Sequence, residues 1–320
     1  MLSRRHLRIK VIQALYAFFQ SGNDRVDLGE RQMLKSVDNI YSLFISQLSF
    51  IVELVSFAST RIENAKKKHI PTEAELNPIT RFIDNRFIIQ LDNNLDFQKK
   101  VEGVKPNWHE QEELIRKIYN EFIDSHEYKY FIKSTSDSYK SDKDIIIVLI
   151  KKFLFENESL QFFYEEKDIH WVDDYYTSFL LILKFIKSYN ENWDESKPIP
   201  ELYKDSSTFE INDDKKLAID LFRKTIVHNN EYEEIIKEKA KNWDIERIAI
   251  MDIILLKTAI TELIEFPSIP VNVTLNEYIE ISKYFSSPRS KIFINGMLDK
   301  IIIELQAENK IKKIGRGLIK

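Results

Sequence analysis

The chain has 320 residues, of which 43% are hydrophobic and 31% charged, and its formal net charge is −4. This length can bury a substantial core and allows one large or two ordinary domains. Because the net charge is slightly negative, any nucleic-acid-binding surface must be local. The lack of cysteine excludes disulfides, thiolate metal sites and cysteine nucleophiles.

The remaining composition argues against an enzyme, a bound cofactor and a membrane span. The six glycines form neither a GxGxxG nor a P-loop pattern, and the six histidines never approach metal-ligand spacing such as HxxxH. No apolar run reaches membrane-spanning length, and the N-terminus lacks a small-residue cleavage site. We therefore expect no catalytic residues, no cofactor, no metal and a cytoplasmic location. Scarce glycine and proline with long amphipathic runs predict an all-α fold.

The first predicted helix spans residues 3–20. Its apolar stripe consists of Leu7, Val11, Ala14, Leu15 and Phe18. Arg4, Arg5 and Arg8 cluster in the first two turns, and Tyr16 shares roughly the side of Arg5. Guanidinium groups bind phosphate bidentately and an aromatic ring can stack on a base, so this face suits RNA. The simpler interpretation is a solvated helix with ordinary surface arginines.

A long amphipathic helix is predicted for residues 30–68, and a large helical stretch follows it. The further helices are predicted at residues 78–91, 107–123, 144–155 and 171–189, with polar breaks at 92–106, 134–143 and 190–213. Residues 145–150 are compatible with a buried strand by composition, but the residues after them favour a buried helix. The many aromatic and acidic residues here indicate either an aromatic core with a solvated face or a docking surface for a protein partner.

Two helices are predicted at residues 215–228 and 231–241, and three more, separated by short breaks, at residues 245–305. The first of the three is apolar on most sides, so it is either central to its domain or covered by a partner. Thr274 and Glu277 fit a capping box at the start of the second. The basic residues after 308 are expected to form a frayed tail.

The last helix carries two competing local signals. Ser287 followed by Pro288 fits a helix start. Asn295-Gly296 is also a hairpin signal, but the four-residue apolar stepping continues through it to Ile302 and favours a helix. A glycine tolerated at position 296 suggests close approach to a neighbouring helix or a ligand.

Short motifs at both ends of the chain occur in a fixed order. They are Arg4-Arg5-His6-Leu7-Arg8, Gln13-Ala14-Leu15-Tyr16, Trp243 to Leu263, Pro270-Val271-Asn272-Val273, Asn276-Glu277, Ile281-Ser282-Lys283-Tyr284-Phe285 and Phe293-Ile294-Asn295-Gly296-Met297-Leu298-Asp299-Lys300. Together they resemble the NusB family of all-helical transcription antitermination factors. The resemblance implies a NusB-like helical bundle built from the first helix (1–20) and the C-terminal helices (213–308). A helical insertion would span 21–212, and a basic tail 309–320.

The resemblance also implies a function. Members of the family bind boxA RNA together with the small-subunit ribosomal protein NusE, act in the RNA polymerase antitermination complex and support transcription of ribosomal RNA operons. By position, the residues expected to face RNA are Arg4, Arg5, Arg8, Gln13, Tyr16, Arg289, Ser290, Lys291 and Asn295. Glu246 and Asp252 match carboxylates that face the ribosomal protein, although a boundary carboxylate in water would look the same.

Two alternatives to an RNA-binding adaptor follow from the same residues. The chain could be a helical protein-interaction scaffold in which the insertion, and not RNA binding, carries the function, or a purely structural helical module that binds neither RNA nor the ribosomal protein. Some rRNA cytosine methyltransferases carry a NusB-like domain, but they need glycine-rich loops and a catalytic cysteine that this chain lacks. The adaptor hypothesis requires that the first helix packs with the last three and that its guanidinium groups are not hidden in acidic partners. Replacing Arg4, Arg5 and Arg8 by alanine is then expected to weaken boxA binding with nearly unchanged thermal stability.

Overall fold

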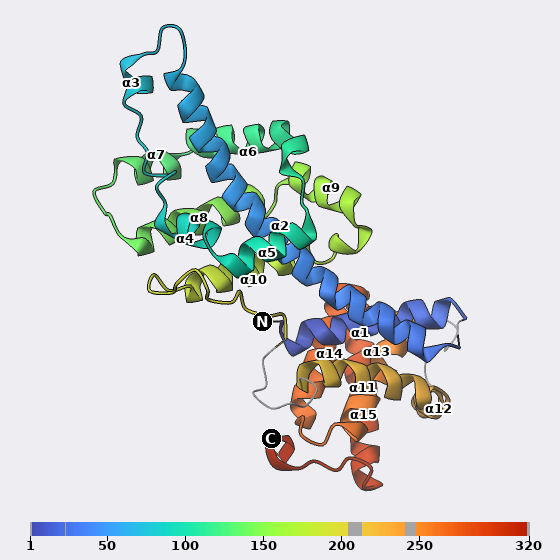
Figure 1. Ribbon diagram of the computed structural model, residues 1–320. Coiled ribbons are helices and arrows are strands. Elements are labelled where there is room, and N and C mark those ends of the chain that lie inside the picture. Colours follow the sequence, from blue (N-terminus) through green and yellow to red (C-terminus); the bar gives the residue numbers. More distant parts are fainter. Residues whose placement is uncertain (1, 23, 204–212, 241–247, 319–320) are drawn as a thin grey trace. The chain divides into compact units, whose positions relative to one another are not determined.

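The computed structural model describes residues 2–22, 24–203, 213–240 and 248–318, apart from the side chains of residues 288, 289 and 316. All regular elements within these residues are helices, which confirms the all-α prediction. Contacts divide the chain into two compact units (Figure 1). Unit 1 combines Met1–Val37 with Tyr203–Lys320, and unit 2 comprises Asp38–Leu202. The sequence-based division had placed the corresponding boundaries after residues 20 and 212.

Unit 1 is a bundle around one central helix. Its helices are α1 (Arg4–Gln20), the start of α2 (Val26–Lys66), α11 (Asp213–Val227), α12 (Asn229–Lys239), α13 (Ile250–Glu265), α14 (Val271–Phe285) and α15 (Pro288–Ala307). α13 contacts α1, α11, α12, α14 and α15, and nearly all of its residues from Ile254 to Leu263 are buried (Figure 1). The opening helix therefore packs directly against α13 and α14 and shares one core with α15, as the hypothesis requires.

The core of unit 1 joins apolar stripes from segments far apart in the sequence. Val11, Ile12 and Leu15 of α1 are fully buried in one cluster with residues of α11, α13, α14 and α15. Burial of such side chains contributes about 1.5–3 kcal/mol each relative to exposure. This stripe fixes which side of α1 faces the bundle, and therefore also where its arginines lie.

Local capping sets the start of α15 as predicted. The Ser287 hydroxyl accepts from the Ser290 amide at 3.2 Å, and Pro288 occupies the first turn. The helix continues through Asn295 and Gly296, so the hairpin alternative is wrong. The expected close approach at Gly296 is also wrong, because an added Cβ would meet no atom within 4 Å.

The start of α14 differs from the prediction. The helix begins at Val271, with Pro270 as its extended N-cap residue, so Thr274 lies inside it and does not cap it. The Thr274 hydroxyl instead donates to Glu262 Oε1 at 2.8 Å, and the Glu277 carboxylate binds Arg5. Proline fixes φ near its helical value and needs no amide partner, so it can begin this helix without a side-chain cap.

Two further expectations for unit 1 are corrected. α13 begins at Ile250, because the Ala249 backbone before it is extended, with ψ 137°. Ile248, which was predicted to lie in this helix, therefore precedes it, and Ile245 lies outside the described residues. The tail is not frayed where it is described. The Ile314 amide donates to the Pro267 carbonyl at 3.0 Å, and Ile311 packs against the core of unit 1.

Unit 2 is built from the rest of α2 and eight shorter helices. These are α3 (Glu73–Leu76), α4 (Arg86–Asp92), α5 (Leu95–Val104), α6 (Glu112–Asp124), α7 (His126–Lys133), α8 (Tyr139–Leu149), α9 (Glu158–Lys167) and α10 (Tyr175–Ser188). The predicted helices at 107–123, 144–155 and 171–189 correspond to α6, α8 with the π turn after it, and α10. The strand alternative for residues 145–150 is therefore wrong.

Other expectations for unit 2 were wrong. The predicted helix at 78–91 is reduced to α4, and the predicted break at 92–106 contains α5, which the Asn94 side chain caps at 2.9 Å from the Phe97 amide. α2 also holds an 18-residue window with a mean hydropathy of 1.7, so a run long and apolar enough to cross a membrane does exist. Because 67% of that window is buried in the structure, a core helix of a folded domain accounts for its composition equally well.

Candidate nucleic-acid interface

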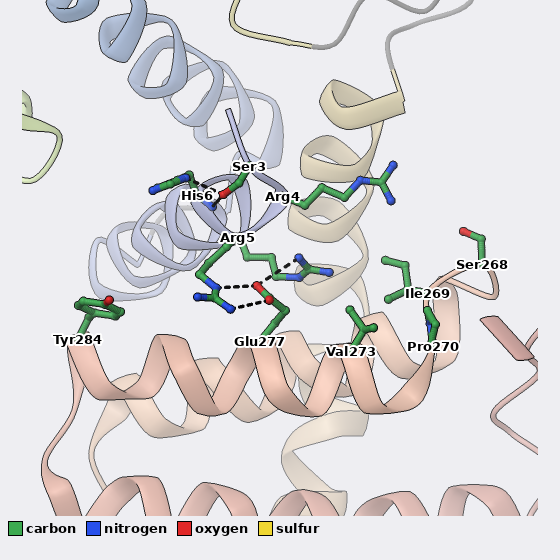
Figure 2. A pocket seen from close by; sticks show the side chains of 11 residues that line it. Ser3, Arg4, Arg5, His6, Ser268, Ile269, Pro270, Val273, Glu277 and Tyr284 are labelled. Atoms are coloured by element: carbon green, nitrogen blue, oxygen red, sulfur yellow. Dashed lines mark hydrogen bonds and ion pairs between the residues drawn. The ribbon is translucent and has the colours of Figure 1, made fainter. Parts of the chain in front are cut away.

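The predicted RNA face of α1 borders an open depression of about 700 Å³ in unit 1. Its lining comes from α1, α14 and the connection before α14: Ser3, Arg4, Arg5, His6, Arg8, Ser268, Ile269, Pro270, Val273, Glu277 and Tyr284 (Figure 2). Ser3 begins α1 as an extended N-cap residue whose hydroxyl accepts from the His6 amide. The cap orients the first turn, so Arg4 and Arg5 emerge at the edge of the depression.

Arg8 lies in the interior and does not face solvent. Its side chain is 3% exposed, and it donates to Glu262 through Nε at 2.6 Å and Nη2 at 2.8 Å. Glu262 is fully buried and also accepts from the hydroxyls of Thr274 and Tyr278. Burial alone would lower the pKa of Arg8, but the attraction and hydrogen bonds of Glu262 outweigh it and raise that pKa. Arg8 therefore joins α1 to α13 and remains charged.

Arg5 forms a second bidentate pair, at the rim of the depression. Its Nε and Nη2 atoms donate to the two carboxylate oxygens of Glu277 at 2.9 and 2.7 Å (Figure 2). The Arg5 side chain is 39% exposed and that of Glu277 19%. The hydrogen bond from Arg5 lowers the pKa of Glu277, so this carboxylate is ionised at neutral pH. Arg8 is the second arginine near this carboxylate, with its Nη1 atom 3.8 Å from Glu277.

Arg4 and His6 complete the first turns of α1. Arg4 points away from the Arg5–Glu277 pair (Figure 2) and binds Asp214 of α11 at 2.9 Å, while its side chain stays 49% exposed. The His6 ring lies 2.7 Å from the Ser3 hydroxyl. Burial, together with the charges of Arg5 and Lys10, lowers the pKa of His6, so the ring is neutral at pH 7. His6 therefore adds no positive charge to this face.

The other candidate RNA residues differ in exposure. Tyr16 and Lys291 are exposed, and Gln13 is half-buried. Ser290 is buried, and its amide donates to Ser287, so this helix N-terminus is already capped. Asn295 donates weakly to Asp299 at 3.5 Å, and the side chain of Arg289 lies outside the described residues.

One aromatic side chain at the depression was not predicted as a site residue. Tyr284, near the end of α14, is 74% exposed and lines the depression together with Arg5 (Figure 2). On the same helix Glu280 binds Lys283, and the charges of Arg5 and Lys291 contribute to the lowered pKa of Glu280. Arg4, Arg5 and Tyr284 line one depression, and Lys283 and Lys291 lie close enough for their charges to act on Glu280. We call the surface made by these five residues the α1–α14 face.

The two candidate partner-binding carboxylates are placed differently. Glu246 lies outside the described residues. Asp252, in the first turn of α13, is 3% exposed and accepts a hydrogen bond from the Ser286 hydroxyl. It lines a small depression with Ala249, Tyr284, Phe285, Ser286, Ser287 and Ser290. No group of three or more His, Asp or Glu side chains among the described residues is arranged to hold a metal ion.

The requirement that the guanidinium groups stay clear of acidic partners is met only in part. Arg8 is hidden by Glu262, whereas Arg4 and Arg5 are paired but remain partly exposed. Because Arg8 neutralises a buried carboxylate, the structure instead leads us to expect that a triple alanine variant loses thermal stability. Sequence reasoning missed Glu262 and the pairing role of Glu277. An acid in an otherwise apolar helix was the available signal for Glu262, because such a group needs a cationic partner.

Comparisons with known proteins add to this geometry. The NusB family model matches residues 181–302. The transcription antitermination protein NusB of Salinibacter ruber is 45% identical over 105 residues, which are 33% of this chain and 66% of that protein. The protein of the same name from Koribacter versatilis is 42% identical over 31% of this chain and 67% of its own length. That from Geobacter sulfurreducens is 38% identical over 38% of this chain and 88% of its own length. No solved structure matches the chain significantly.

The fold and the comparisons agree on one class of protein. Unit 1 is an all-α bundle in which an arginine-rich opening helix shares one core with three closing helices, and the matched residues include all of α11 to α14 and most of α15. The chain belongs to the NusB family. Unit 2 lies largely before the matched residues, so this member carries a long helical addition.

Proposed function

We propose that the chain is a transcription antitermination factor that binds boxA-type RNA together with the ribosomal protein NusE. It would act in the cytoplasm within an RNA polymerase antitermination complex and support transcription of ribosomal RNA operons. The observation that carries the proposal is the 38–45% identity to proteins named transcription antitermination protein NusB. The partly exposed cations of the α1–α14 face and the exposed rings of Tyr16 and Tyr284 support it.

The proposed RNA contacts are divided by exposure. Arg4, Arg5 and Lys291 would bind phosphates, and Tyr16 would stack on a base. Further contacts to the RNA at the edges of the site would come from Gln13, Arg289, Ser290 and Asn295. Arg8 is a positioning residue in this proposal, because its guanidinium is buried against Glu262. Contacts to phosphate make the affinity fall with salt, whereas base contacts determine the sequence that is bound.

The proposed protein partner would approach near the start of α13. A basic protein such as a ribosomal protein suits carboxylates, and Glu246 and Asp252 are the proposed contacts. Asp252 is bonded to Ser286 in the isolated chain, so a partner cation would have to reach it through the depression beside Ser286 and Ser287. Because the two proposed contact regions share Tyr284, RNA and protein are expected to bind cooperatively.

A titration of labelled boxA RNA tests the proposal. The full chain, with and without NusE, is compared with a double variant, Arg4→Ala/Arg5→Ala. We expect the affinity to be highest with NusE present and to fall by roughly tenfold or more in the double variant. Arg116→Ala is the matched control, since Arg116 is exposed and paired with a carboxylate in unit 2. Equal RNA affinity in the double variant and the wild type would contradict the RNA role of α1.

A specific observation also favours the scaffold alternative. Three apolar side chains of unit 2 are exposed and spaced four residues apart. They are Val172, which follows a 3-10 turn, and Tyr176 and Leu180 on α10. Exposed apolar side chains in one row are typical of a surface that binds another protein. If the chain binds no boxA RNA with or without NusE, this surface becomes the leading candidate for its function.

A further inference from the structure

Three cations of the α1–α14 face each form an ion pair with a carboxylate from a neighbouring turn or helix. Arg4 binds Asp214, Arg5 binds Glu277, and Lys283 binds Glu280. Such pairs cancel much of the positive potential that would attract RNA. A phosphate that binds an arginine here must therefore replace a carboxylate and not merely a shell of water.

The pairs differ in how readily they can be exchanged. Glu262 is fully buried and binds Arg8 with two further hydrogen-bond donors around it, so this pair is fixed. Glu277 is partly exposed at the rim of the depression, and it occupies Nε and Nη2 of Arg5. That edge of a guanidinium is one that binds two phosphate oxygens at once. Glu277 therefore stands where a phosphate would bind Arg5.

Arg8 provides a second cation with which Glu277 can pair. Arg8 holds Glu262 through Nε and Nη2, and its remaining nitrogen, Nη1, lies 3.8 Å from the Glu277 carboxylate. A small rotation of the Glu277 side chain toward Arg8 would shorten this contact and release Arg5. The carboxylate would remain paired, so the exchange avoids leaving an isolated charge in a partly buried site.

We propose that Glu277 is an exchangeable counter-ion of Arg5 that lowers the affinity of this face for RNA. The proposal rests on the RNA-binding function proposed above. In the free protein Arg5 binds Glu277; in the complex Arg5 binds a phosphate and Glu277 turns to Arg8. Because the phosphate that binds Arg5 must meet the cost of this exchange, an RNA needs further contacts, such as those to its bases, to bind tightly. Non-specific RNA is held weakly.

The test compares Glu277→Gln with Glu280→Gln in the full chain. Both variants remove one negative charge from the same helix, three residues apart, but only Glu277 binds Arg5. With boxA RNA and NusE, we expect Glu277→Gln to tighten binding by roughly five- to twentyfold, and to tighten binding of a scrambled RNA by a similar factor, because both RNAs place a phosphate on Arg5. The slope of log K against log salt should stay nearly unchanged, because Arg5 binds one phosphate in both the wild-type and the variant complex. Glu280→Gln should change the affinity for either RNA by less than about threefold.

A double-mutant cycle shows whether the effect passes through Arg5. In an Arg5→Ala background, Glu277→Gln should no longer tighten binding. Thermal unfolding of each variant checks the fold, and Glu277→Ala serves as a second substitution with the same expected direction.

Three results would overturn the proposal: unchanged or weaker RNA binding by both Glu277 variants, equal tightening by Glu280→Gln, or tightening that persists without Arg5. If the wild type and all variants fail to bind RNA in the presence of NusE, the proposed function itself is wrong. Binding by the wild type without tightening in Glu277→Gln refutes the counter-ion role alone.

Discussion

Replacing Arg8 by alanine should destabilise unit 1 strongly. The substitution leaves the Glu262 carboxylate fully buried without its cation, although the hydroxyls of Thr274 and Tyr278 remain nearby. Removing one partner of a buried ion pair costs about 3–5 kcal/mol, because the charge left behind is neither solvated nor paired. For a unit of this size such a loss lowers the melting temperature by roughly 10 °C. Lys283→Ala, which removes a pair with Glu280 that is exposed on both sides, should cost far less.

Urea unfolding followed by circular dichroism measures this difference. Because the chain has two compact units, the transition of unit 1 should shift to lower urea while that of unit 2 stays in place. A second variant, Arg8→Met/Glu262→Gln, removes both charges and should recover part of the lost stability. The reasoning about the buried pair is refuted if Arg8→Ala costs no more than Lys283→Ala, or if the double variant is less stable than Arg8→Ala.

Other consequences of the structure can be tested separately. Gly317→Ala should release the tail, because the added Cβ would lie 2.0 Å from the Pro267 carbonyl oxygen; limited proteolysis within residues 309–318 should become faster. Gly296→Ala is its control, since that position is open and helical, and it should stabilise the protein by about 0.5–1 kcal/mol. Burial lowers the pKa of Lys313 from 10.5 to about 8, so the unfolded chain binds this proton more tightly than the folded one. Between pH 8 and pH 10.5 this group should therefore make the free energy of unfolding increase with pH, and the increase should be absent in Lys313→Met. A rise of equal size in wild type and Lys313→Met would assign the pH dependence to other groups.

The sequence was informative wherever the physical cause of an element is local. The start of α15 could be predicted because Ser287 and the amide that it caps are three residues apart. The all-α class and the buried stripe of α1 followed from helical periodicity, which also acts over a few residues. α5 was missed because its short run of mixed residues gives a weak periodic signal, and the Asn94 cap was not recognised as a helix start.

The candidate site was less predictable, because its pairs are long-range. Arg5 and Glu277 are 272 residues apart, and the capping interpretation of Glu277 was plausible only because that tertiary partner could not be seen. The same holds for Thr274, whose hydroxyl binds Glu262 and leaves the start of α14 to Pro270. Sequence patterns placed the arginines on the correct helix but could not show which of them is buried.

The pairing of Arg8 with Glu262 has a consequence for biosynthesis. The two residues are separated by 254 positions, so at about 5–20 residues per second the ribosome needs roughly 10–50 s to supply the carboxylate after the arginine. During that interval α1 has no α13 against which to bury its apolar stripe. The nascent helix should therefore be a natural substrate for chaperones, and unit 2, whose residues all emerge in between, has time to fold before α1 can dock.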